Sequence, residues 1–74
     1  MVFIRVRAGV YHTENGLSII HDKDDKLWYI VYKGVALHRC PTLTDAKYIC
    51  TKHYRNKSYA EHTMNMRIQK GVLL

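Results

Sequence analysis

The chain has 74 residues and a mass of 8.7 kDa, which suffices for one small domain and excludes a multidomain enzyme. A composition of 47% hydrophobic and 24% charged residues, with one proline, indicates a folded chain and excludes collagen-like and low-complexity classes. No apolar run reaches the roughly 18 residues that a membrane span requires, and Arg5 and Arg7 interrupt the apolar stretch that a signal peptide needs. We therefore expect a single domain over residues 1–74, located in the cytoplasm.

The formal net charge is +6, and the positive charge is concentrated toward the C-terminus. Residues 46–74 carry six lysines and arginines and only one acid, Glu61, whereas residues 14–45 carry four bases and five acids. Such an uneven distribution favours a polyanionic partner, because each neutralised phosphate releases condensed counterions. The alternative is a basic but inert solvated surface.

Alternation of apolar and polar residues predicts strands in the first half of the chain, at about residues 2–13, 17–22, 26–32 and 35–40. Three dipeptides have the composition of tight turns, and two-residue turns fix the register of the strands that they join. These are Asn15-Gly16, Asp24-Asp25 and Lys33-Gly34.

Register in turn determines which side chains share a face of the sheet. Two-residue turns place Trp28 opposite both His21 and Arg39, and Ile30 opposite both Ile19 and Leu37. The predicted core face carries Leu17, Ile19, Trp28, Ile30, Tyr32, Val35 and Leu37. The opposite face carries Ser18, Ile20, Tyr29, Val31, Ala36 and His38, joined by Tyr11 and Thr13 if the first hairpin turns at Asn15-Gly16.

After Pro41 the apolar period changes to 3.6, which predicts a helix over about residues 43–55. Thr42 is a favourable N-cap, and Asp45 complements the helix N-terminus. The predicted buried stripe covers the face of Trp28 and consists of Leu43, Ala46, Ile49, Cys50 and either His53 or Tyr54.

Residues 57–74 are predicted to form a C-terminal strand or tail. Met64, Met66 and Ile68 alternate with polar residues, which favours a strand, while residues 59–66 are also compatible with a weak helix. The predicted fold class is α+β, with an antiparallel sheet of three to five strands packed on one face by a single α-helix.

The candidate chemistry of the chain is sparse. His38, Cys40, Cys50 and His53 are suitable zinc ligands, but their spacing matches no familiar zinc pattern, so reduced core thiols are the favoured interpretation. The cluster of Asp22, Asp24 and Asp25 lacks the glycine and the distal glutamate of a calcium loop. No nucleophile has an evident base and oxyanion site. We therefore expect no metal, no cofactor and no enzymatic activity.

Six tyrosines and one tryptophan accompany twelve cations, a combination found in nucleic-acid readers and in protein interfaces. Trp28 and Tyr32 are assigned to the core, and Tyr11 and Tyr29 to the accessible sheet face. The other tyrosines lie among the cations of the predicted helix and tail. Each exposed tyrosine could instead complete a small core.

The segment 17–54 resembles small phage and mobile-element domains in which three strands precede one helix. The resemblance rests on residues 26–34, Lys-Leu-Trp-Tyr-Ile-Val-Tyr-Lys-Gly, and residues 41–47, Pro-Thr-Leu-Thr-Asp-Ala-Lys. The relatives in shape are the arm-type DNA-binding domains of tyrosine recombinases, whose sheet enters the major groove while the helix packs behind it. The resemblance implies that Tyr29, Val31, Lys33, Ala36 and His38 face the groove.

We therefore expect a small non-enzymatic regulatory protein of phage or mobile-element type, acting in the cytoplasm of a host cell. It binds nucleic acid, with DNA favoured, through a basic surface and an aromatic sheet face. The alternative is a protein-binding inhibitor or adaptor that blocks a host or defence enzyme. Both a monomer and a homodimer are compatible with the sequence, because strand 2–7 could form an uncovered edge. The predicted nucleic-acid-binding residues are Arg5, Arg7, Tyr29, Lys33, His38, Lys47, Lys52, Arg55 and Lys57.

Overall fold

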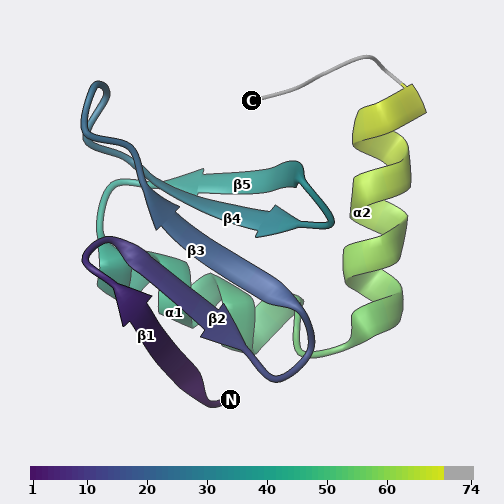
Figure 1. The fold of residues 1–74 in the computed structure, drawn as a ribbon. Coiled ribbons are helices and arrows are strands. Elements are labelled where there is room, and N and C mark those ends of the chain that lie inside the picture. Colours follow the sequence, from purple (N-terminus) through teal and green to yellow (C-terminus); the bar gives the residue numbers. More distant parts are fainter. Residues whose placement is uncertain (70–74) are drawn as a thin grey trace.

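A computed structural model describes residues 1–69 (Figure 1). These residues form a five-stranded antiparallel sheet in the order β1-β2-β3-β4-β5, followed by two helices. The predicted α+β class and the antiparallel sheet are thus confirmed, whereas the prediction of a single helix is wrong. The elements are β1 (Phe3–Arg7), β2 (Val10–Thr13), β3 (Leu17–His21), β4 (Trp28–Tyr32), β5 (Val35–Cys40), α1 (Leu43–His53) and α2 (Lys57–Gln69).

The core lies between one face of the sheet and the two helices. Ile19, Ile30 and Leu37 are fully buried there, and Ala46, Cys50 and Ala60 contact them from the helices. In Figure 1, α1 lies across the sheet and α2 stands beside it near β5. Trp28 packs against this core as predicted. The helices and the core therefore share one face of the sheet, and we call the other the open sheet face.

The predicted strand 2–13 is two strands. The chain reverses at Ala8-Gly9, where Gly9 has a φ of +77° and Arg7 pairs with Val10. A positive φ is readily adopted by glycine, which explains why the regular alternation breaks there. The prediction of one continuous strand is therefore wrong, and β1 becomes an edge of the sheet.

The register between β3 and β4 agrees with the prediction. His21 pairs with Trp28 and Ile19 with Ile30. The loop is longer than two residues, because Asp22 and Leu27 remain hydrogen-bonded across residues 23–26, but it has the same midpoint. The pairing of side chains is consequently unchanged.

The register between β2 and β3 differs from the prediction by one residue. His12 pairs with Ser18 and Tyr11 with Ile19, because the loop spans residues 14–16 and only its third residue, Gly16, has a positive φ. The Thr13 hydroxyl accepts a hydrogen bond from the backbone N–H of Leu17 across this loop. Tyr11 and Thr13 therefore lie on the helix side and not on the open sheet face.

The register between β4 and β5 begins as predicted and then changes. Tyr32 pairs with Val35 across a Lys33-Gly34 turn in which both residues have a positive φ. A bulge follows, so that Ile30 pairs with His38 and Trp28 with Cys40. The predicted pairs of Ile30 with Leu37 and of Trp28 with Arg39 are therefore wrong. Because a bulge inserts one residue, it moves His38 to the helix side, away from Tyr29.

Helix α1 forms where the sequence predicts it. The Thr42 hydroxyl accepts a hydrogen bond from the backbone N–H of Asp45, which confirms the N-cap. Ala46 and Cys50 are buried, and Tyr54 caps the C-terminus with its ring in the core. Of the two alternatives for the last stripe position, Tyr54 is buried and His53 is exposed.

Helix α2 replaces the strand predicted for the tail. The Asn56 side chain accepts a hydrogen bond from the backbone N–H of Ser58 at the start of this helix. Ala60 and Met64, four residues apart, pack on the core. The apolar alternation was misleading, because Met66 and Ile68 are exposed on the helix surface. The predicted tail beyond residue 69 lies outside the described residues. Across residues 1–69, none of the helices combines the length and the hydrophobicity needed to cross a membrane.

Candidate nucleic-acid interface

Of the seven lysines and arginines among the predicted binding residues, five lie on the helix side of the molecule. Arg5 pairs with Tyr11 across β1 and β2 and therefore shares the face of α1. The remaining four belong to α1, to the connection after it and to the first position of α2. We call this set the basic helix face, and it consists of Arg5, Lys47, Lys52, Arg55 and Lys57.

The charges of the basic helix face are not neutralised by nearby acids. Within residues 1–69, the one ion pair joins Lys33 to Glu61. The Glu14 carboxylate contributes a weak attraction with Arg55, but it does not come within ion-pair distance. Cations that lack carboxylate partners retain their charge for an external anion.

Aromatic rings accompany these cations. The Lys47 ammonium lies 5.1 Å from the centre of the Tyr11 ring and 5.6 Å from that of Phe3. The Lys52 ammonium lies 5.4 Å from the ring of Tyr48 and donates a hydrogen bond to its hydroxyl. Tyr48 is itself 58% exposed. These contacts orient the lysines without removing their charge.

Arg7 and Tyr29 lie on the open sheet face instead. Arg7 pairs with Val10, which in turn pairs with Ile20. The Tyr29 hydroxyl donates a hydrogen bond to the Asp25 carboxylate, and this bond lowers the pKa of Asp25. Asp22 and Lys23 also line the shallow hollow around Tyr29. The open sheet face therefore combines few cations with nearby carboxylates.

Lys33 is engaged within the molecule. Its ammonium is 2.6 Å from a carboxylate oxygen of Glu61, and the Tyr32 hydroxyl donates to the same oxygen at 2.9 Å. These two hydrogen bonds lower the pKa of Glu61. The partners of Glu61 lie on β4 and in the following turn, 29 and 28 residues earlier in the chain, so local sequence spacing does not reveal them.

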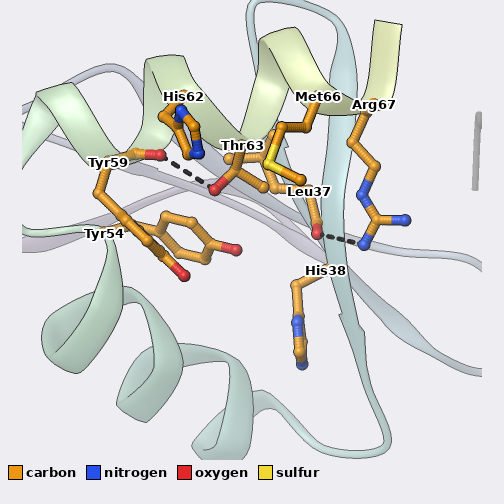
Figure 2. A pocket seen from close by; sticks show the side chains of 8 residues that line it. All are labelled: Leu37, His38, Tyr54, Tyr59, His62, Thr63, Met66 and Arg67. Carbon is orange, nitrogen blue, oxygen red and sulfur yellow. Dashed lines mark hydrogen bonds between the residues drawn. The ribbon is translucent and has the colours of Figure 1, made fainter. Parts of the chain in front are cut away.

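His38 lines a cleft between β5, the end of α1 and α2 (Figure 2). The cleft has a volume of about 420 Å³. Burial lowers the pKa of His38, and the charges of Arg67 and His53 lower it further. The Arg67 guanidinium donates a hydrogen bond to the carbonyl of Leu37 at 3.0 Å. We call this the tyrosine cleft, and it is lined by Leu37, His38, Tyr54, Tyr59, His62, Thr63, Met66 and Arg67.

Both cysteines are free thiols in the core. Burial raises the pKa of Cys50 to about 12, and Cys40 adds to this shift. A protonated, buried thiol is a poor nucleophile and a poor metal ligand. In the stretch from residue 1 to residue 69, no three histidine, cysteine or acidic side chains are placed to share a metal ion.

The residues that the resemblance assigns to a DNA groove do not form one surface. Tyr29, Val31 and Ala36 line the hollow of the open sheet face, Lys33 is held by Glu61, and His38 is on the helix side. Comparison with protein-family models, curated proteins and solved structures finds no match to this chain.

The part of the site that the sequence did not predict is the α2 wall of the tyrosine cleft. In a strand these residues would lie on both faces, whereas α2 brings them to the same cleft. They are at positions 59, 62, 63, 66 and 67. The spacing of these residues by three and four is helical, and Asn56 before Ser58 is an N-terminal signal. These two features could have identified the cleft wall.

Proposed function

We propose that the protein is a non-enzymatic nucleic-acid-binding protein of regulatory type that uses the basic helix face. The observation that carries this proposal is the set of five cations without carboxylate partners in residues 1–69. Most of the binding energy of a non-specific nucleic-acid complex comes from such cations, because they displace counterions from the phosphates. The phage or mobile-element setting stays a prediction from the resemblance.

The placement of charge argues for binding by the helix side and not by the sheet. A sheet that enters a DNA groove presents cations and hydrogen-bond donors to the phosphates and base edges. The cations of the open sheet face are Arg7, Lys23 and Arg39, and the Tyr29 hydroxyl already donates its hydrogen bond to Asp25. Phosphate contacts are therefore assigned to α1 and to the connection between the helices.

Fluorescence anisotropy with labelled single-stranded and duplex oligonucleotides at low salt tests the proposal. The double variant Lys52→Gln/Arg55→Gln removes two charges from the basic helix face. The matched control Lys23→Gln/Arg39→Gln removes two charges elsewhere, from the β3–β4 loop and from β5. We expect the first variant to weaken binding about tenfold or more and the control to weaken it less than threefold, because phosphate contacts carry most of the affinity. Equal losses, or no binding by the wild type, would contradict the proposal.

A second candidate function, a protein contact through β1, is supported by the exposure of its apolar side chains. Ile4 is 61% exposed and Val6 49%, and β1 is an edge of the sheet. Such an edge suits strand addition by another chain, as in an inhibitor or adaptor, or by a second copy of this chain.

Homodimer formation through β1 can be tested by measuring the mass of the protein in solution over a range of concentrations. If β1 pairs with its counterpart, the wild type shows a dimer mass and Ile4→Lys a monomer mass. A monomer mass for the wild type at the highest concentration would exclude the homodimer.

A further inference from the structure

The tyrosine cleft combines aromatic walls with cationic and neutral polar groups. The Tyr54 and Tyr59 rings lie 5.5 Å apart, centre to centre, and are tilted by 33°. Tyr54 is buried in the core, whereas Tyr59 is 47% exposed at the mouth of the cleft. A volume of about 420 Å³ falls in the range of about 300 to 1,000 Å³ that is typical of small-molecule sites.

The charge of the cleft selects against a cation. Its lining contains Arg67 and two histidines, His38 and His62, and none of the lining residues within 1–69 is acidic. The Arg67 guanidinium uses one N–H group on the carbonyl of Leu37 and has further N–H groups for another acceptor. An anion would therefore be favoured beside Arg67.

The polar groups inside the cleft suit the edge of a heterocycle. The His38 side chain makes no hydrogen bond within residues 1–69, and its lowered pKa favours the neutral imidazole, which offers one donor and one acceptor. The Thr63 hydroxyl donates to the carbonyl of Tyr59 and retains its acceptor capacity. Figure 2 shows His38 and Arg67 on the same side of the cleft.

The cleft also lies next to the basic helix face. Tyr54 is the C-cap of α1, and Arg55 and Lys57 follow it within three residues. The ring of His53, in the last turn of α1, is 6.4 Å from that of Tyr59, centre to centre. A strand held by these cations would thus pass the mouth of the cleft.

We propose that the tyrosine cleft binds an unstacked nucleobase together with its phosphate, with the base on Tyr59 and the phosphate beside Arg67. A duplex keeps its bases stacked and paired, so this site selects single-stranded nucleic acid over duplex. This preference for single-stranded nucleic acid rests on the proposed function. A free mononucleotide presents the same base and phosphate and is the second source of this ligand chemistry.

The test compares a labelled single strand, a duplex of equal length and a mononucleotide. Tyr59→Ala removes a ring that is 47% exposed and lies beside Tyr54. Tyr59→Phe keeps the ring, and Tyr29→Ala removes a ring from the open sheet face. Stacking on an aromatic side chain predicts that Tyr59→Ala weakens single-strand binding by about 5- to 150-fold. Tyr59→Phe and Tyr29→Ala should stay within about twofold of the wild type, and duplex binding should be weaker than single-strand binding and insensitive to Tyr59→Ala.

The possible failures are distinguishable. If Tyr59→Ala leaves single-strand affinity within twofold while Lys52→Gln/Arg55→Gln weakens it, the proposed function stands and the cleft proposal is overturned. If oligonucleotides do not bind but a mononucleotide binds in a manner that depends on Tyr59, the cleft ligand is the free nucleotide and the proposed function fails. Binding of none of the three probes overturns both.

Discussion

The side-chain amide of Asn15 donates a hydrogen bond to the backbone carbonyl of Tyr54 at 2.7 Å, across 39 residues of sequence. The same side chain accepts a hydrogen bond from the Thr13 hydroxyl, so it connects the β2–β3 loop to the end of α1. The carbonyl groups at the C-terminus of a helix have no partner within the helix. Asn15 therefore serves as a C-terminal cap contributed by a distant loop, and it positions the start of the connection to α2.

Removing this cap should destabilise the protein. We expect Asn15→Ala to lower the free energy of unfolding by about 1 to 2 kcal/mol, the cost of a lost hydrogen bond to a partly buried carbonyl. Asn15→Asp should cost more, because it places a negative charge beside the negative end of α1. Urea unfolding followed by Trp28 fluorescence measures both, with the exposed Asn65→Ala as the control. Equal stabilities for Asn15→Ala and Asn65→Ala would contradict the capping role.

Glu61 should contribute stability that is lost in acid. Its pKa is lowered by hydrogen bonds from Lys33 and Tyr32, so its stabilising effect is fully present above the ordinary value of 4.5 and disappears as the pH falls through the lowered value. In Glu61→Gln, the loss of stability below about pH 4.5 should therefore be smaller than in the wild type. Urea titrations between pH 2 and pH 7 test this, and identical pH profiles for the two proteins would show that the interaction contributes nothing.

The thiol of Cys50 should be inert in the folded protein. Burial raises its pKa to about 12, and the thiolate is the reactive form. We expect a disulfide reagent at pH 8 to label Cys50 only as fast as the protein opens, and to label it within the mixing time in denaturant. Rapid labelling of Cys50 in the native protein would contradict the assigned burial.

The same thiol should make stability fall at high pH. Cys50 stays protonated in the folded state up to about pH 12, while the unfolded thiol ionises near its ordinary value of 9.0. The stability contribution is thus complete below about pH 9 and is lost as the pH rises toward 12. Tyrosines and lysines also titrate there, so the comparison is with Cys50→Ala, whose stability should decline less over that interval. An equal decline would exclude the thiol as a cause.

Local signals in the sequence predicted the elements whose geometry is local. Lys33-Gly34 supplies two residues that adopt a positive φ, and Thr42 and Asp45 together form an N-cap, so the β4–β5 turn and the start of α1 were predictable. The apolar stripe of α1 and the core face of β3 and β4 were also predictable, because both follow from local periodicity.

The remaining features depend on long-range contacts. Asn15-Gly16 is compatible with both a two-residue and a three-residue loop, and the hydrogen bonds of Asn15 to residues 54 and 55 accompany the longer one. Helix α2 has weak amphipathic patterning and is supported by Tyr32 and by the carbonyl of Leu37. The predicted site residues Tyr29 and His38 lie on different sides of the sheet because of the bulge between β4 and β5, which local sequence signals do not reveal.

The salt dependence of binding shows whether phosphates contact the basic helix face. The affinity of the wild type and of Lys52→Gln/Arg55→Gln for a single-stranded oligonucleotide is measured over a range of salt concentrations. If phosphates contact Lys52 and Arg55, log affinity falls linearly with log salt, and the slope is smaller by about 1.4 in the variant, since each lost phosphate contact contributes about 0.7. Equal slopes for the two proteins, or an affinity that does not respond to salt, would contradict the assignment of the basic helix face to nucleic acid.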